Sequence, residues 1–185
     1  MDDSTAEASK VGQLSVTLQG TNFGVDVNPA ADALRVVGDQ GQNLRFSFSA
    51  GTTTVDGTLT YPPATMPVAG VSAAAYTNND LDPNTATTLF DLDASLDQIA
   101  IQAPANSGQL SATGKLTIDA GPNAGFDIYS EINGGTTVDV QGFATLAVNG
   151  TYRLYEINIL TGKATDRGGY FRNIEVFDLA LPLDQ

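Results

Sequence analysis

The sequence predicts an all-β fold, arranged as a β-propeller-like array of about three to four four-stranded blades. Short runs of alternating apolar and polar residues recur along the chain, and Gly, Pro, Asn or Asp follows most of them. No segment keeps the helical apolar period of roughly 3.6 residues over three turns. Similar segments return after units of roughly 45–50 residues, the length of one blade. A β-sandwich or a β-barrel is the alternative architecture.

The alternating runs place the expected strands. Val25 and Val27, for example, alternate with polar neighbours, and turn-forming residues close the run. Segment 95–103 could be drawn as a helix, but Ile99 and Ile101 alternate, so we expect a strand there. The expected strands are 13–18, 23–28, 34–37, 44–49, 57–61, 72–77, 88–93, 98–102, 110–116, 125–130, 143–148, 153–159, 163–168 and 174–181.

A sequence echo defines the repeating unit. Gly-Gln-Leu-Ser at 12–15 precedes Phe-Gly-Val-Asp at 23–26, and Gly-Gln-Leu-Ser at 108–111 precedes Gly-Phe-Asp-Ile at 125–128. The offset of roughly 100 residues spans two units, and each unit holds about four short strands, as a propeller blade does. If the first and last expected strands share a blade, the array closes on itself.

Length and composition bound the organisation and the chemistry. In a chain of 185 residues we expect a flexible N-terminal tail over 1–11 and a single all-β domain over 12–185. The chain holds no His and no Cys, which excludes catalysis by those residues, zinc bound through imidazole or thiolate, and disulfides. The net charge of −13 disfavours nucleic acid as a partner. Of the 21 acidic residues 17 are Asp, which favours turns over helix interiors.

Apolar stretches are too short to span a bilayer, so no transmembrane segment is expected. The chain begins with acidic residues and no apolar run follows, so no signal peptide is visible. The absence of Cys fits an exported bacterial protein that does without disulfides. We therefore expect a secreted protein, extracellular or periplasmic.

Several segments together resemble a bacterial exported family of unknown function. They are Phe-Gly-Val-Asp-Val-Asn-Pro at 23–29, the segment 32–45 with Leu-Arg-Val-Val-Gly-Asp-Gln-Gly-Gln-Asn-Leu-Arg, and Ala-Ala-Tyr-Thr-Asn-Asn at 74–79. Segments 88–93 and 154–165 match the repeated Leu-Tyr-x-Ile-Asp strands of that family. The resemblance implies β-propeller-like repeats, with a further blade before the Phe-Gly-Val-Asp strand that is not in this chain. It implies no particular activity, because the family has none assigned.

One acidic segment suggests a calcium site. Asp80, Asp82 and Asn84 place oxygen ligands at alternate positions, as at the opening of calcium-binding loops, and Asp91 could complete the site. Thr85 stands where an EF-hand needs Gly, so the segment is not an EF-hand. The alternative is a solvated turn rich in Asp and Asn.

Three further aspartates share an apolar context. Asp26, Asp127 and Asp178 lie in Gly-Val-Asp-Val, Gly-Phe-Asp-Ile and Val-Phe-Asp-Leu. In a propeller the innermost strands line a central channel, so these side chains are candidates for a channel metal or a polar-ligand site. Alternatively, the three carboxylates accept backbone N–H bonds or hold ordered water.

Basic residues flank two glycine-containing turns, and Arg167 and Arg172 flank the second of them, Gly-Gly-Tyr-Phe at 168–171. Arg35 and Arg45 lie on either side of Gly-Asp-Gln-Gly-Gln-Asn, and we expect them to form ion pairs with Asp32 and Asp39. The turn has no lysine and no following helix, which excludes a phosphate-binding loop of the P-loop kind.

These features favour a non-enzymatic binding or protein-interaction module, stabilised by calcium if the acidic segment binds it. An unclosed β array leaves strand edges that seek pairing, so we expect a homo-oligomer or a protein partner that completes it. One alternative is a propeller-type hydrolase acting on a lactone, an ester or a glycoside. The other alternative is a structural surface or matrix protein.

Overall fold

The computed structural model describes residue 5 and residues 7–78, 86–133 and 136–181. This part of the chain forms twelve strands, two short 3₁₀ helices and no α-helix. The strands make three four-stranded antiparallel sheets, and none of the three closes on itself. The all-β prediction is confirmed.

Each sheet is a meander of four strands that follow one another in the chain. The first contains β1 (Phe23–Asn28), β2 (Ala33–Gly38), β3 (Asn43–Ser47) and β4 (Thr52–Val55). The second contains β5 (Val71–Tyr76), β6 (Leu89–Asp93), β7 (Gln98–Gln102) and β8 (Leu110–Lys115). The third contains β9 (Ala124–Asn133), β10 (Thr136–Val148), β11 (Thr151–Ile157) and β12 (Ala164–Gly169). The 3₁₀ helices are η1 (Ala105–Ser107) and η2 (Phe171–Asn173).

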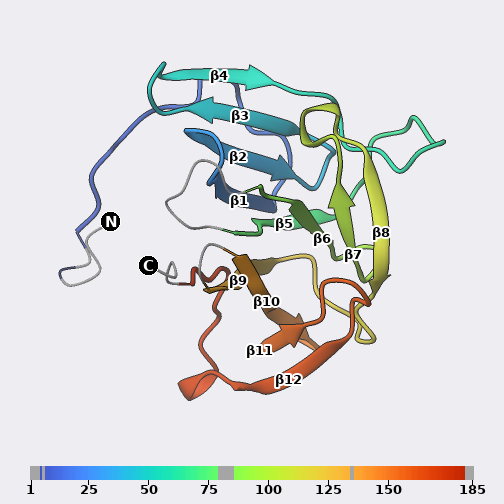
Figure 1. Cartoon of the computed structure of the whole chain (residues 1–185). Helices are drawn as coiled ribbons and strands as arrows, with labels where there is room; N and C mark the ends of the chain where they lie inside the picture. The colour runs from blue at the N-terminus through green and yellow to red at the C-terminus, as the bar shows by residue number, and fades with distance from the viewer. Residues whose placement is uncertain (1–4, 6, 79–85, 134–135, 182–185) are drawn as a thin grey trace.

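The three sheets fan out from one side of the molecule (Figure 1). The first strands of the sheets, β1, β5 and β9, lie beside one another in the middle, with β5 in contact with both of the others. The last strands, β4, β8 and β12, form the outer rim. We call β1, β5 and β9 the inner strands.

Two apolar cores hold the fan together, one on each face of the second sheet. The core between the first and second sheets contains Val37, Leu59, Tyr76 and Leu89. The core between the second and third sheets contains, among others, Ala73, Ala75, Leu92, Phe126, Ile128 and Leu146. Because both faces of the second sheet are covered, every residue of β5 and β6 is buried.

Most of the expected strands overlap a strand of the structure, and β7 has the expected bounds. Three expectations are wrong, because segments 13–18, 57–61 and 174–181 form no strand. Segment 13–18 bonds to side chains instead: Ser15 N donates to Thr53 Oγ1, and Thr17 O accepts from Gln42 Nε2. The strand β4 was not expected, since its Thr-rich sequence has no apolar alternation.

Candidate functional site

The expected calcium ligands cannot be assembled from the described part of the chain. Asp80, Asp82 and Asn84 lie outside the described residues, and only Asp91 can be placed, on β6. Within the described ranges, no three or more acidic residues are grouped so that they could hold a metal ion. Calcium binding at residues 80–84 therefore stays a prediction.

Asp91 is fully buried, on the side of β6 that faces the first sheet. Neither of its carboxylate oxygens has a hydrogen-bond partner among the described residues. Burial raises the pKa of Asp91 well above its usual value, the positive charge of Arg35 opposes this shift, and Asp93 adds to it. Asp91 therefore favours its neutral acid form. The carboxylate of Asp93 accepts hydrogen bonds from Tyr61 Oη, at 3.1 Å, and from the backbone of the β6–β7 turn.

Asp26 joins the first inner strand to the second. One carboxylate oxygen, Oδ2, accepts a hydrogen bond from the Tyr76 backbone N–H on β5 at 2.6 Å. The other oxygen, Oδ1, accepts from the N–H of Val27 at 2.7 Å. Two positions before Asp26, Gly24 lies so close to Ala73 of β5 that a side chain would overlap that backbone. Gly24 and Asp26 thus dock β1 on β5.

Asp127 makes the same contacts one sheet further on. Its Oδ2 accepts from the Leu181 backbone N–H at 2.7 Å, and its Oδ1 accepts from the N–H of Ile128 at 2.7 Å. Gly125 lies against the Cα of Asp178, as Gly24 lies against Ala73. The spacing of three residues from Ala73 to Tyr76 returns from Asp178 to Leu181. Segment 178–181 therefore lies on β9 as β5 lies on β1.

The three predicted channel carboxylates lie close enough to influence one another. Burial raises the pKa of Asp26 to about 7; the hydrogen bond from Tyr76 opposes the shift, and the charges of Asp127 and Asp178 add to it. Burial also raises the pKa of Asp127. Asp178 is exposed, and its Oδ1 accepts from the N–H of Leu179. Backbone N–H groups thus engage an oxygen of each carboxylate.

Arg35 forms a polar centre between the first and second sheets that the sequence did not reveal. Its side chain is only 2% exposed. It donates to Tyr76 Oη at 3.2 Å, to Asn43 Oδ1 at 2.8 Å, to Asp56 Oδ2 at 2.7 Å and to Asn106 Oδ1 at 2.8 Å. Arg35 therefore ties residues from both sheets and from η1 into one network.

The predicted ion pairs of the two arginines are wrong, because Arg35 and Arg45 both pair with Asp56. Asp32 accepts instead from the Ser49 N–H, and Asp39 accepts from residues of segment 21–22. Arg35 and Arg45 lie directly opposite each other in the β2–β3 register. Two like charges in that position repel each other, so a shared carboxylate stabilises the pair. The sequence signal for this shared carboxylate was the position of two arginines opposite each other on the two strands of a hairpin.

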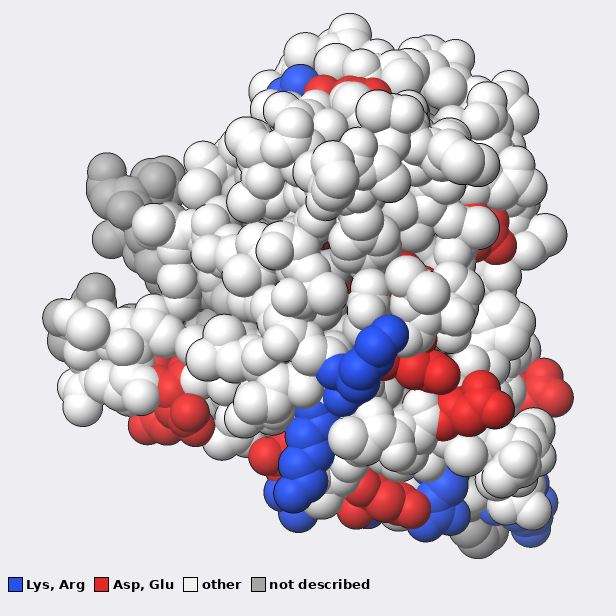
Figure 2. All heavy atoms as spheres, turned by 90° about the vertical axis from the view of Figure 1, so that its right-hand side faces the viewer, with Lys and Arg blue, Asp and Glu red and all other residues white. Residues whose placement is uncertain are grey.

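Charged residues of both signs are mixed on the third sheet. Arg153 pairs with Asp166, and Arg167 pairs with Glu156, between β11 and β12. Figure 2 shows basic and acidic side chains next to one another over the lower part of the molecule. No described helix has the length and hydropathy needed to cross a bilayer.

The family model described as a domain of unknown function (DUF4394) matches residues 1–180. The chain belongs to this family. No match is found among curated proteins or among solved structures. Because the family has no assigned function, a function for the chain has to be argued from its own residues.

Proposed function

We propose that the chain is a non-enzymatic, exported interaction module, a propeller-like array of three blades completed by a second copy of itself. The central support is a difference in burial between two equivalent positions. In the repeated Gly-x-Asp-x unit, Phe126 and Ile128 of β9 are 3% and 0% exposed. At the same positions of β1, Val25 and Val27 are 45% and 46% exposed.

The difference follows from which sheets cover each inner strand. Side chains alternate between the two faces of a strand, so Val25 and Val27 point away from β5, on which Asp26 docks. Phe126 and Ile128 lie in the core that contains Ala73 and Ala75 of β5. No described sheet lies on the corresponding side of β1. The first sheet therefore presents an inner face with no neighbouring blade.

The N-terminal segment covers the outer part of this face but leaves the inner part open. Gly12 lies against the ring of Phe46, which shares a face with Val27 through the β1–β2–β3 register. Phe46 is 4% exposed, in contrast to the two valines. Isolated exposed apolar residues are ordinary, but an exposed pair at a position that is a core elsewhere in the chain points to a missing neighbour.

The other end of the fan offers the matching surface. Segment 178–181 lies on β9 as β5 lies on β1, so Asp178 and Ala180 stand where Ala73 and Ala75 stand. In the described structure Ala180 is exposed, whereas Ala75 is buried under the third sheet. Segment 178–181 of one copy can therefore receive Val25 and Val27 of another copy.

A pair of copies closes the array. If the first sheet of each copy meets segment 178–181 of the other, two equivalent contacts arise around a two-fold axis. The two copies then contribute six sheets, within the range of about four to eight blades that propellers use. Closure also protects the open ends that would otherwise invite unwanted association.

A hydrolase is the less favoured alternative, because its channel carboxylates are engaged by backbone N–H groups. Asp26 and Asp127 each use both oxygens to accept such bonds. These bonds fix the positions of the inner strands, which is a structural task.

Disulfide trapping tests the proposed contact, since the natural chain holds no Cys. Val25→Cys and Ala180→Cys variants are mixed under mild oxidation, and we expect a cross-linked dimer that contains one of each. The control replaces Val25→Cys with Val138→Cys, which is 56% exposed on β10, outside the proposed contact. Equal cross-linking in the two mixtures would contradict the proposal.

A further inference from the structure

A small polar cavity lies between the first and second sheets, beside the Arg35 network. Its volume is about 110 Å³, and Asn28, Arg35, Arg45, Tyr76 and Asn106 supply its polar lining. Since water occupies roughly 30 Å³ per molecule in the liquid, the space suits a few waters or one compact ion. Two of the eight Lys and Arg residues of this acidic chain line the cavity.

The charges around the cavity do not balance. Among the described residues, Asp56 is the one carboxylate bonded to the two guanidinium groups: Oδ2 accepts from Arg35 and Arg45, at 2.7 and 2.6 Å, and Oδ1 accepts from Arg45 at 3.0 Å. Two positive charges thus share one negative charge. Asp26 and Asp91 are the nearby acids on β1 and β6, and burial raises the pKa of both, which favours their uncharged forms.

Several hydrogen-bond donors at the cavity have no acceptor among the described residues. Arg45 uses Nε and Nη2 on Asp56, which leaves both N–H groups of Nη1 without a described acceptor. Asn106 accepts from Arg35 through Oδ1, so its amide Nδ2 is left to donate. Tyr76 accepts from Arg35 Nε through its hydroxyl oxygen, so the hydroxyl proton is also left to donate.

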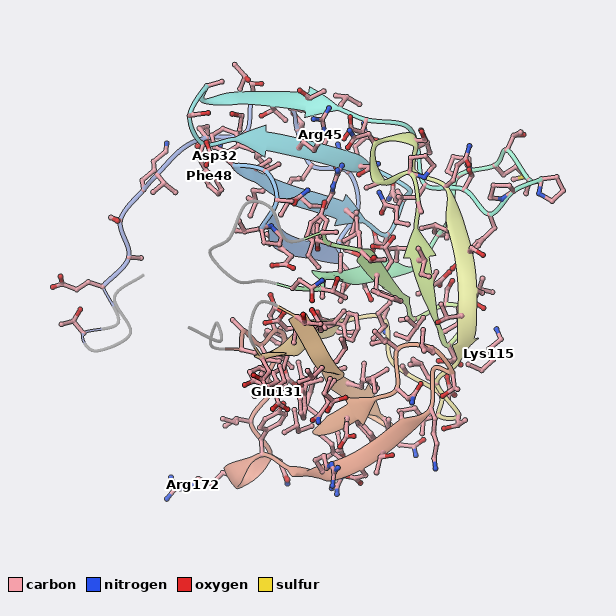
Figure 3. All side chains as sticks on the ribbon, in the orientation of Figure 1. Asp32, Arg45, Phe48, Lys115, Glu131 and Arg172 are labelled. Carbon is pink, nitrogen blue, oxygen red and sulfur yellow. The ribbon has the colours of Figure 1, made fainter. Side chains whose placement is uncertain are left out.

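Arg35 fixes this arrangement and is nine-tenths or more buried. Its bonds to Asn106 and Tyr76 hold both side chains beside the cavity. Arg45, labelled in Figure 3, comes from β3, and its side chain is 37% exposed, so the site has access to solvent. Preorganised donors with an excess of positive charge are typical of oxyanion recognition.

We infer that this cavity binds a compact oxyanion, a carboxylate or a phosphate group, through Arg45, Asn106 and Tyr76. The site lies on the side of β1 opposite to Val25 and Val27, so this inference does not depend on the proposed dimer.

Calorimetric titration at pH 6 tests the inference, with sodium phosphate and sodium acetate injected in separate experiments at constant ionic strength. We expect saturable binding of at least one of the two ions, above a sodium chloride control. Binding of phosphate alone identifies a phosphate site, and binding of acetate alone identifies a carboxylate site. Absence of saturable binding for both ions would overturn the inference.

Two variants assign the binding to this cavity. Arg45→Gln should weaken it by about tenfold or more, the loss expected for one hydrogen bond to a charged group. Arg153→Gln is the matched control, because Arg153 is also 37% exposed and makes the same two-bond contact with a carboxylate, that of Asp166. Equal affinity in the two variants would overturn the assignment.

Asn106→Asp covers the case in which Arg45→Gln fails to fold. The new carboxylate can still accept from Arg35, but it removes the amide donor and neutralises the excess charge. We expect a folded protein with no measurable oxyanion binding. Retained affinity in Asn106→Asp would overturn the inference.

Discussion

The carboxyl group of Asp26 links the protonation state of one residue to the stability of the whole chain. Burial raises its pKa from 3.8 to about 7 in the folded protein. The folded state therefore holds the proton more tightly than the unfolded state does. By linkage, the contribution of Asp26 to the free energy of unfolding falls as the pH rises from about 4 to about 7.

Replacement of Asp26 by Asn removes this titration while leaving an oxygen that can accept from Tyr76. We expect the stability of Asp26→Asn to increase relative to the natural protein between pH 5 and pH 8, measured by urea unfolding. Asp166→Asn is the control, because the hydrogen bond from Arg153 lowers the pKa of Asp166 below 3.8, so this variant should differ from the natural protein by a constant amount between pH 5 and pH 8. If Asp26→Asn and the natural protein showed the same pH trend, Asp26 would not titrate in this range.

At the scale of single residues, the sequence could predict that an aspartate accepts backbone hydrogen bonds more easily than it could predict which residue donates them. The similar contexts of Asp26 and Asp127 were visible, and backbone N–H bonding was one of the two predicted outcomes. The N–H groups that donate to these two carboxylates, on Tyr76 and Leu181, lie roughly 50 residues away in the chain, and only the folding of the chain brings donor and acceptor together. The shared Asp56 of Arg35 and Arg45 was missed for the same reason, since it depends on strand register.

At the scale of the elements, the fan depends on two close approaches, of β1 to β5 at Gly24 and of β9 to segment 178–181 at Gly125. A methyl group on Gly24 would overlap the backbone of Ala73 and Ala74, and one on Gly125 would overlap Asp178. Because β5 is held on both faces, it cannot move away from β1 without disturbing a core. Segment 178–181 has no described sheet on its outer side and can move more easily.

We therefore expect Gly24→Ala to lower the free energy of unfolding by about 3 kcal/mol, at the upper end of overpacking costs, and Gly125→Ala to lower it by less. Gly121→Ala is the milder comparison, because its new methyl group would lie 3.2 Å from the Cβ and 3.3 Å from the carbonyl oxygen of Ala147, whereas the methyl group on Gly24 would lie 2.5 Å from backbone atoms of Ala73 and Ala74. Urea unfolding measures the free energy of unfolding of the three variants and so gives their order of stability. A Gly24→Ala variant as stable as Gly121→Ala would contradict the docking of β1 on β5.

Strands with apolar alternation were predictable, whereas those held by other means were not. Strand β7 was predicted at its observed bounds because Ile99 and Ile101 alternate in one core. Strand β4 is Thr-rich and mostly exposed, so no apolar pattern marked it. Segment 57–61 looked like a strand, yet Thr60 forms only an isolated bridge with Gln109, and Gly57 lies against the backbone of Ser107.

At the scale of the whole molecule, the proposed dimer depends on the uncovered face of the first sheet. Phe126 and Ile128 show that this position of the repeat lies in a core when a neighbouring sheet covers it. Val25 and Val27 carry apolar side chains at the same position without that neighbour. In the proposed dimer a second copy would supply it through segment 178–181, and the array would then become a closed ring.

The most direct measurement of this claim is the mass in solution, by light scattering on a sizing column at several protein concentrations. The chain has a mass of 19.2 kDa, and the account predicts a particle of twice that mass that persists on dilution. A particle of 19.2 kDa at every concentration would contradict it, because the first sheet would then be uncovered in solution.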